Sequence, residues 1–108
     1  MAYKKGYVFE RELKKDLERK GWCVIRSGGS KKPDMVAAKN GKILIIECKS
    51  TTKDNIYLEK EEVEKMKKTA AAFDAECIYA VKRNNKGFCL IDTDQLVEKE
   101  NSYFISLK

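Results

Sequence analysis

Near the start of the chain, apolar residues recur at every fourth position. Phe9, Leu13 and Leu17 follow this spacing and are separated by charged residues, which is the pattern of an amphipathic helix. Gly21 follows directly, and glycine commonly ends helices. We therefore predict a helix over residues 6–20 with one buried face.

Three strands are predicted to follow this helix. Residues 22–26, 34–39 and 42–49 are rich in β-branched and other apolar residues, as strands are. The segment 27–33 between the first two is rich in Gly, Ser and Lys and is predicted to be a loop. Asn40-Gly41 is a strong signal for a two-residue hairpin turn. The two strands that flank this turn are apolar on both faces, so we expect them in the middle of a sheet.

The second half of the chain predicts one more helix and two more strands. The helix is expected from about Leu58 to Phe73, with Leu58, Met66, Ala70 and Phe73 on one side and a solvated Glu/Lys face on the other. Residues 77–82 and 87–92 read as strands, and the tail from Thr93 as a short helix and an edge strand. This order predicts an α/β fold, a mixed five-stranded central sheet flanked by helices, in a single domain spanning residues 1–108.

Composition narrows the classes of function. The 108 residues are 43% hydrophobic and carry a net charge of +6, so the chain can form one small core and favours a polyanionic partner, above all nucleic acid. The chain contains no histidine. Catalytic triads that use histidine and metal sites with histidine ligands are therefore excluded.

Apolar runs and cysteines bear on the expected location. The longest apolar run, 43–46, is far shorter than the roughly 20 residues of a membrane-spanning helix, and no secretory signal is seen. We therefore expect a cytoplasmic protein that does not enter a membrane. The four cysteines are widely spaced, so we expect buried free thiols.

Two acidic residues are predicted to face each other at the base of the hairpin. Counting back from the Asn40-Gly41 turn pairs Asp34 with Glu47, with Cβ atoms about 4.5–5.5 Å apart on one side of the sheet. Adjacent carboxylates repel unless a cation lies between them, and hard oxygen ligands suit Mg²⁺. Lys49 lies two positions beyond Glu47 and therefore on the same face. This group favours a metal-dependent phosphodiester site, although Glu47 and Lys49 could also form an ordinary ion pair.

On the first helix, Glu10 and Arg11 occupy different positions relative to the apolar stripe. At about 100° per residue, Glu10 falls on the border of that stripe. Arg11 lies well away from it. An acidic side chain is therefore expected where the helix meets its neighbour.

These motifs, taken together, resemble one family of nucleases. The chain is similar to the archaeal Holliday-junction resolvases, which belong to the restriction-endonuclease-like superfamily, over nearly its whole length. The segments that carry the resemblance are Gly6-Tyr7-Val8-Phe9-Glu10-Arg11-Glu12-Leu13, Val24-Ile25-Arg26-Ser27-Gly28-Gly29-Ser30, Pro33-Asp34 and Ile46-Glu47-Cys48-Lys49.

The resemblance implies a role for each matching residue. Asp34, Glu47 and the backbone carbonyl of Cys48 would bind Mg²⁺, for which Mn²⁺ could substitute, and Glu10 would help to position the metal or the water. Lys49 would orient or deprotonate the attacking water. Further residues would act near the phosphate or contact DNA: Ser30 beside the scissile phosphate, and Arg11, Arg26, Lys31, Lys32, Lys4, Lys5 and Lys53 along the DNA.

The implied activity is metal-dependent resolution of four-way junctions, in recombination and repair at the nucleoid. Two opposed strands must be cut and the chain has one candidate site, so a homodimer is expected, with the segment 70–73 as one apolar surface for it. One alternative is a restriction- or repair-type nuclease of the same superfamily. Another is a DNA-binding module without catalysis.

Overall fold

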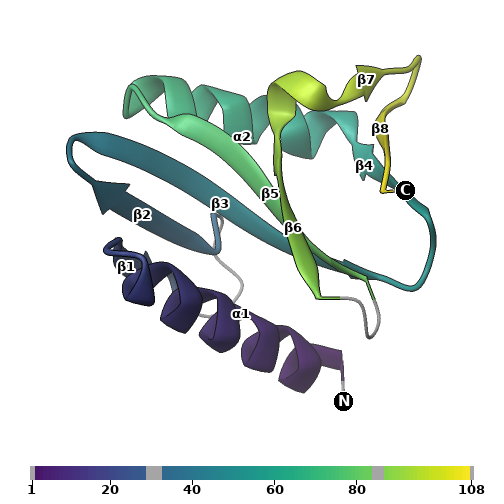
Figure 1. The fold of residues 1–108 in the computed structure, drawn as a ribbon. Helices are drawn as coiled ribbons and strands as arrows, with labels where there is room; N and C mark the ends of the chain where they lie inside the picture. The colour runs from purple at the N-terminus through teal and green to yellow at the C-terminus, as the bar shows by residue number, and fades with distance from the viewer. Residues whose placement is uncertain (1, 29–32, 84–86, 108) are drawn as a thin grey trace.

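The computed structural model describes residues 2–28, 33–83 and 87–107, with side chains from Val8 onward (Figure 1). Its elements, in chain order, are α1 (Ala2–Arg19), β1 (Cys23–Arg26), β2 (Met35–Lys39), β3 (Lys42–Thr51), β4 (Asn55–Glu59), α2 (Lys60–Ala72), β5 (Glu76–Arg83), β6 (Phe88–Asp92), the 3₁₀ helix η1 (Thr93–Gln95), β7 (Val97–Glu98) and β8 (Ser102–Ser106).

A five-stranded mixed sheet forms the centre of the molecule, in the order β1-β2-β3-β5-β6. Strands β3 and β5 are parallel, and every other neighbouring pair in this sheet is antiparallel. The parallel pair is joined through α2, which provides the crossover that parallel strands need. The predicted mixed five-stranded sheet flanked by helices is confirmed.

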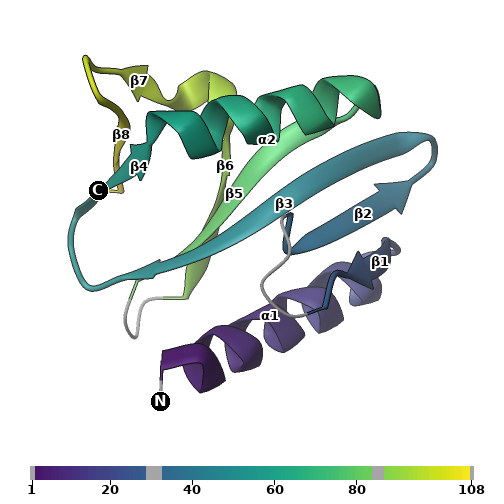
Figure 2. The same ribbon diagram turned by 180° about the vertical axis from the view of Figure 1, so that it is seen from behind.

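The two helices cover opposite faces of this sheet (Figures 1 and 2). Along β3, Leu44 and Ile46 pack with the apolar face of α1, whereas Ile45 packs with the apolar residues of α2. This alternation follows from the two-residue period of a strand. Both faces of β3 are therefore buried, as the continuous apolar run predicted.

Helix α1 buries the stripe that its spacing predicted. Phe9, Leu13 and Leu17 are 2%, 0% and 3% exposed. The helix starts at Ala2, earlier than expected. It ends before Gly21, which adopts a left-handed φ of +94° while Trp22 N–H bonds back to the Leu17 carbonyl at 3.0 Å, so the predicted glycine cap is confirmed.

A second, three-stranded sheet in the order β4-β8-β7 was not predicted. Leu58 belongs to β4, where it pairs with Tyr103 of β8, and not to the helix, which begins at Lys60. Phe73, expected on the buried side of that helix, is its C-terminal cap residue and is 51% exposed. The helix buries Val63, Met66 and Ala70 instead.

The expectation of buried thiols holds for Cys77 alone among the four cysteines. Cys23 and Cys89 are exposed and Cys48 is half-buried. The reason is that β1 and β6 are the edge strands of the central sheet. In the described part of the chain, no helix is long and apolar enough to cross a membrane.

Candidate active site

The hairpin formed by β2 and β3 has the register that its turn predicted. Asn40 and Gly41 adopt left-handed φ angles of 50° and 82°, as a two-residue hairpin turn requires. The pairing runs from Lys39–Lys42 to Met35–Ile46. Asp34 is the next residue beyond the last pair, and its Oδ2 accepts a 2.8 Å hydrogen bond from the backbone N–H of Cys48. The structure thus brings the Asp34 carboxylate to the Glu47–Cys48 segment.

Glu47 is buried in the central sheet. Its exposure is 2%, and its register partner on β5 is Tyr79, which is 0% exposed. Removing a carboxylate from water is costly, and charged groups held in such positions are often found at functional sites.

Lys49 lies two residues further along β3 and contacts α2. Its Nζ donates to Oε1 of Glu62 at 3.0 Å, and the Tyr79 hydroxyl donates to Oε2 of the same carboxylate at 2.8 Å. Sequence reasoning missed Glu62, because it placed the charged residues of this helix on a solvated face. Glu62 and Lys49 are both mostly buried, with side-chain exposures of 17% and 28%.

Glu10 lies on α1, which covers the face of the sheet opposite to α2. Its Oε1 accepts a 3.0 Å hydrogen bond from Nη2 of Arg26, at the end of β1, and both side chains are mostly buried. Glu10 therefore lies on the border of the buried stripe, as its position on the helix predicted. The ion pair between these two residues was not foreseen.

The three acidic side chains of the candidate site act on the Cys48 thiol. Burial raises the pKa of the Cys48 thiol above its ordinary value, and the negative charges of Asp34, Glu10 and Glu47 raise it further. The Arg26 charge opposes this rise in pKa. The field at Cys48 is thus dominated by negative charge.

The oxygen donors at the hairpin suit a hard divalent cation. Within residues 2–28, 33–83 and 87–107, no group of three or more Asp, Glu, Cys or His side chains is arranged to hold a metal ion. Mg²⁺ often needs no more than one or two carboxylates, with waters and phosphate oxygens completing its coordination. Asp34, Glu47 and the Cys48 carbonyl would supply such oxygen donors, so the chemistry of the donors fits Mg²⁺.

The basic residues predicted to contact DNA are placed unevenly. Arg11 and Lys53 are exposed, on α1 and in the turn after β3. Lys4 and Lys5 belong to α1, but their side chains lie outside the described part of the structure. Ser30, Lys31 and Lys32 lie outside it altogether. Ser27 bonds to the start of the next described segment: its hydroxyl donates to the Pro33 carbonyl at 2.7 Å, and its N–H donates to the Asp34 carbonyl at 3.0 Å.

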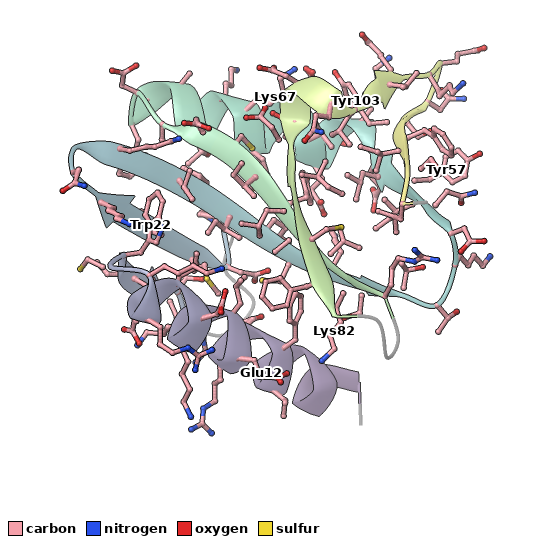
Figure 3. The ribbon with its side chains drawn as sticks, in the orientation of Figure 1. Glu12, Trp22, Tyr57, Lys67, Lys82 and Tyr103 are labelled. Atoms are coloured by element: carbon pink, nitrogen blue, oxygen red, sulfur yellow. The ribbon has the colours of Figure 1, made fainter. Side chains whose placement is uncertain are left out.

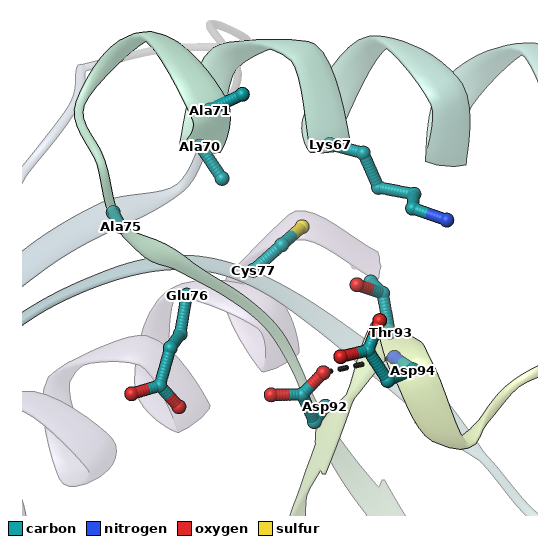
Figure 4. Close-up of a pocket in the computed structure, with 9 residues that line it drawn as sticks. All are labelled: Lys67, Ala70, Ala71, Ala75, Glu76, Cys77, Asp92, Thr93 and Asp94. Atoms are coloured by element: carbon teal, nitrogen blue, oxygen red, sulfur yellow. Dashed lines mark hydrogen bonds between the residues drawn. The ribbon is translucent and has the colours of Figure 1, made fainter.

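A separate cavity of about 230 Å³ lies between the end of α2 and η1 (Figure 4). None of the predicted site residues lines it. The residues around it are Lys67, Ala70, Ala71, Ala75, Glu76, Cys77, Asp92, Thr93 and Asp94.

Comparisons with known proteins identify one family. The family model described as archaeal Holliday junction resolvase (Hjc) matches residues 1–108. Over 84 residues the chain is 44% identical to a protein of Methanocaldococcus jannaschii named crossover junction endodeoxyribonuclease Hjc, covering 78% of this chain and 63% of that one. It is 33% identical over 106 residues to the protein of the same name from Archaeoglobus fulgidus, covering 94% and 78%.

A solved structure shows the same fold. It is the Archaeoglobus fulgidus Hjc, titled a Holliday junction resolvase, with a TM-score of 0.86 and 32% identity over 94% of this chain and 84% of that one. The predicted restriction-endonuclease-like fold is thereby confirmed. The matched region spans less than two thirds of the length of the Methanocaldococcus relative.

Proposed function

Because the chain belongs to the archaeal Holliday junction resolvase family, we propose that it is an endodeoxyribonuclease that resolves four-way DNA junctions. Residues 1–108 would form one nuclease domain. Its substrate, DNA undergoing recombination or repair, would place it at the nucleoid in the cytoplasm.

The observation that carries this proposal is the group of charged residues at the base of the β2–β3 hairpin. Asp34 accepts a hydrogen bond from the Cys48 N–H. Glu47, which precedes Cys48 on β3, is buried, and Lys49 follows Cys48 on the same strand. A protein that only bound DNA would gain nothing from acidic residues facing a phosphate, which supports a catalytic function over a binding module.

The proposed roles follow from these positions. Asp34, Glu47 and the Cys48 carbonyl would hold Mg²⁺, or Mn²⁺ in its place. The bound ion would polarise the scissile phosphate and stabilise the leaving oxygen. Lys49 would orient the attacking water and balance charge on the phosphate. Glu10, held by Arg26, would help to place the water.

DNA would be held through its backbone. Exposed Arg11 and Lys53, with Lys4, Lys5, Lys31 and Lys32, would contact phosphates without reading bases. Ser30 would lie near the scissile phosphate. Selection of the junction would then depend on DNA shape.

A homodimer would supply the second cut. Each chain offers one hairpin site, and a two-fold pair would place two sites on opposed strands. Exposed Phe73, with Ala71 and Ala72 beside it, is the surface we propose for the contact. Ala70 is buried within its own chain and is not part of it.

The test is a panel of labelled substrates of shared sequence: a four-way junction, a linear duplex and a flap. Each is incubated with Mg²⁺ and with a chelator. The proposal predicts paired, symmetric nicks in the junction with Mg²⁺, and uncut duplex and flap. Cutting of every substrate would favour the restriction- or repair-type nuclease, and tight binding with no cutting would favour the binding module.

A further inference from the structure

A chain of hydrogen bonds links Lys49 to the interior of the molecule. The Lys49 ammonium donates to one oxygen of the Glu62 carboxylate at 3.0 Å, and the Tyr79 hydroxyl donates to the other at 2.8 Å. The three residues come from three elements, β3, α2 and β5. Glu62 is therefore a bridge between a strand of the candidate site and the neighbouring strand.

Tyr79, at the end of this bridge away from Lys49, is held in place by packing. Tyr79 is 0% exposed and lies in the middle of β5, paired in register with Glu47. Helix α2 holds the Glu62 backbone rigidly, because the next residue, Val63, is 0% exposed and Met66 is 3% exposed. A hydroxyl on a buried tyrosine of a packed strand has few alternative positions.

The Lys49 side chain, at the other end of this bridge, needs such support. Lysine is a flexible four-carbon chain with a point charge at its tip, and a catalytic group must stay within about 0.5 Å of its productive position. A carboxylate that accepts one hydrogen bond from Tyr79 keeps a defined orientation for its other oxygen. That oxygen is the one that Lys49 contacts.

We infer that Glu62 and Tyr79 are positioning residues for Lys49, holding its ammonium at the end of the hairpin where Asp34 and Glu47 lie. This inference rests on the proposed function, since it assigns Lys49 a part in phosphodiester cleavage. Neither residue is assigned contact with the DNA. Both act through Lys49.

The same helix offers a matched control. Glu64 lies two positions beyond Glu62 and accepts a 2.8 Å hydrogen bond from the Tyr103 hydroxyl of β8. Tyr103 lies beside Lys67, at the second sheet (Figure 3). The variants Glu64→Gln and Tyr103→Phe therefore remove the same kind of contact without touching Lys49.

The experiment measures single-turnover cleavage of a four-way junction with Mg²⁺, and junction affinity in the presence of chelator. We expect Glu62→Gln to slow cleavage about 10- to 100-fold and Tyr79→Phe several-fold, because a misplaced catalytic group costs rate. Affinity should stay within about twofold. Glu64→Gln and Tyr103→Phe should cut at the wild-type rate.

A double-variant cycle separates positioning from general damage. If Glu62 acts through Lys49, adding Glu62→Gln to Lys49→Ala should cause no further loss of rate. Full additivity of the two losses would overturn the inference, and so would a wild-type rate in Tyr79→Phe. If Glu62→Gln does not fold, the same cycle is run with Tyr79→Phe, alone and combined with Lys49→Ala. Tyr79→Phe keeps the packed ring and removes only the hydroxyl, so it tests positioning of Lys49 in the folded protein.

A second readout does not depend on cleavage. In ¹⁵N NMR spectra, a held ammonium exchanges its protons slowly, so Lys49 should give a signal that Lys49→Ala lacks and that weakens in Tyr79→Phe. The signal should persist in Tyr103→Phe. Failure of the wild type to cut junctions would reject the proposed function, whereas a Lys49 signal unchanged by Tyr79→Phe would reject this inference.

Discussion

Asp34, Glu47 and Lys49 are held at the base of one hairpin, and each has a different chemical environment. Asp34 is fixed by a backbone N–H, Glu47 is buried in the sheet, and Lys49 is paired with Glu62 across to α2. The placement of Asp34 at the Glu47–Cys48 segment was predictable, because a two-residue turn sets the register along the hairpin. The contact with Glu62 was not predictable, since it depends on how α2 packs on the sheet.

Replacing either proposed metal ligand should separate cutting from binding. Asp34→Asn and Glu47→Gln keep the side-chain shape but remove the charge that would hold Mg²⁺. We expect cleavage to fall more than about 100-fold, because even changes to groups that support ligands cost 10- to 100-fold. Junction affinity, measured by gel shift, should be retained. Loss of binding with intact cutting of other DNA would contradict the assignment.

The cysteines should differ in reactivity toward alkylating reagents. Burial raises the pKa of the Cys77 thiol to about 11, and burial with three nearby carboxylates raises that of Cys48. Because the thiolate is the reactive form, both should react slowly at pH 8 while exposed Cys23 and Cys89 react quickly.

Mass spectrometry after brief alkylation measures the modified fraction of each cysteine. The rate at Cys77 should rise about tenfold per pH unit as the pH increases toward 11. In denaturant all four thiols should react alike. Fast labelling of Cys48 in the folded protein would argue against the arrangement of the site.

At the scale of elements, the hairpin turn is the part on which the candidate site depends most. Gly41 has a φ of +82°, and a Cβ built there would meet nothing within 4 Å. Gly41→Ala should therefore lower the free energy of unfolding by about 1–2 kcal/mol through backbone strain alone. Gly28→Ala, at a glycine that likewise has open space but no positive φ, should change it by less than about 0.5 kcal/mol. Equal effects in urea denaturation would refute this explanation.

The buried stripe of α1 allows a second test at this scale. Leu13 is fully buried between the helix and the sheet, whereas Lys15 is exposed. We expect Leu13→Ala to lower the free energy of unfolding by about 2–5 kcal/mol and Lys15→Ala by less than about 0.5 kcal/mol. Thermal and urea denaturation measure both; a small effect at Leu13 would mean that α1 does not pack as described.

Local patterns predicted most elements but not the second sheet. The helix α1, the hairpin and the five central strands carry clear periodicity or turn signals. Strand β4 was missed because Leu58 also fits the helical spacing of Met66 and Ala70, and because its partner β8 lies far along the chain. The helix starts two residues later, after Glu59, whose backbone is extended. Pairing with a distant strand outweighed the local spacing.

For the whole molecule, the net charge of +6 predicts salt-dependent binding to DNA. Combined Lys31→Ala and Lys32→Ala substitutions should weaken junction binding and reduce the slope of log Kd against log salt by about 2. Lys99→Ala, at the turn between β7 and β8, should leave the slope unchanged. An unchanged slope in the double variant would remove these lysines from the DNA-binding surface.

The central proposal for the whole molecule is that a dimer makes two opposed cuts in one four-way junction. A supercoiled plasmid with an inverted repeat that extrudes a four-way junction measures it directly, with a plasmid lacking the repeat as control. With Mg²⁺, two opposed cuts within one binding event should convert the repeat plasmid straight to linear DNA and leave the control supercoiled. Accumulation of nicked circles, or equal cutting of both plasmids, would contradict the claim that this chain is a dimeric junction resolvase.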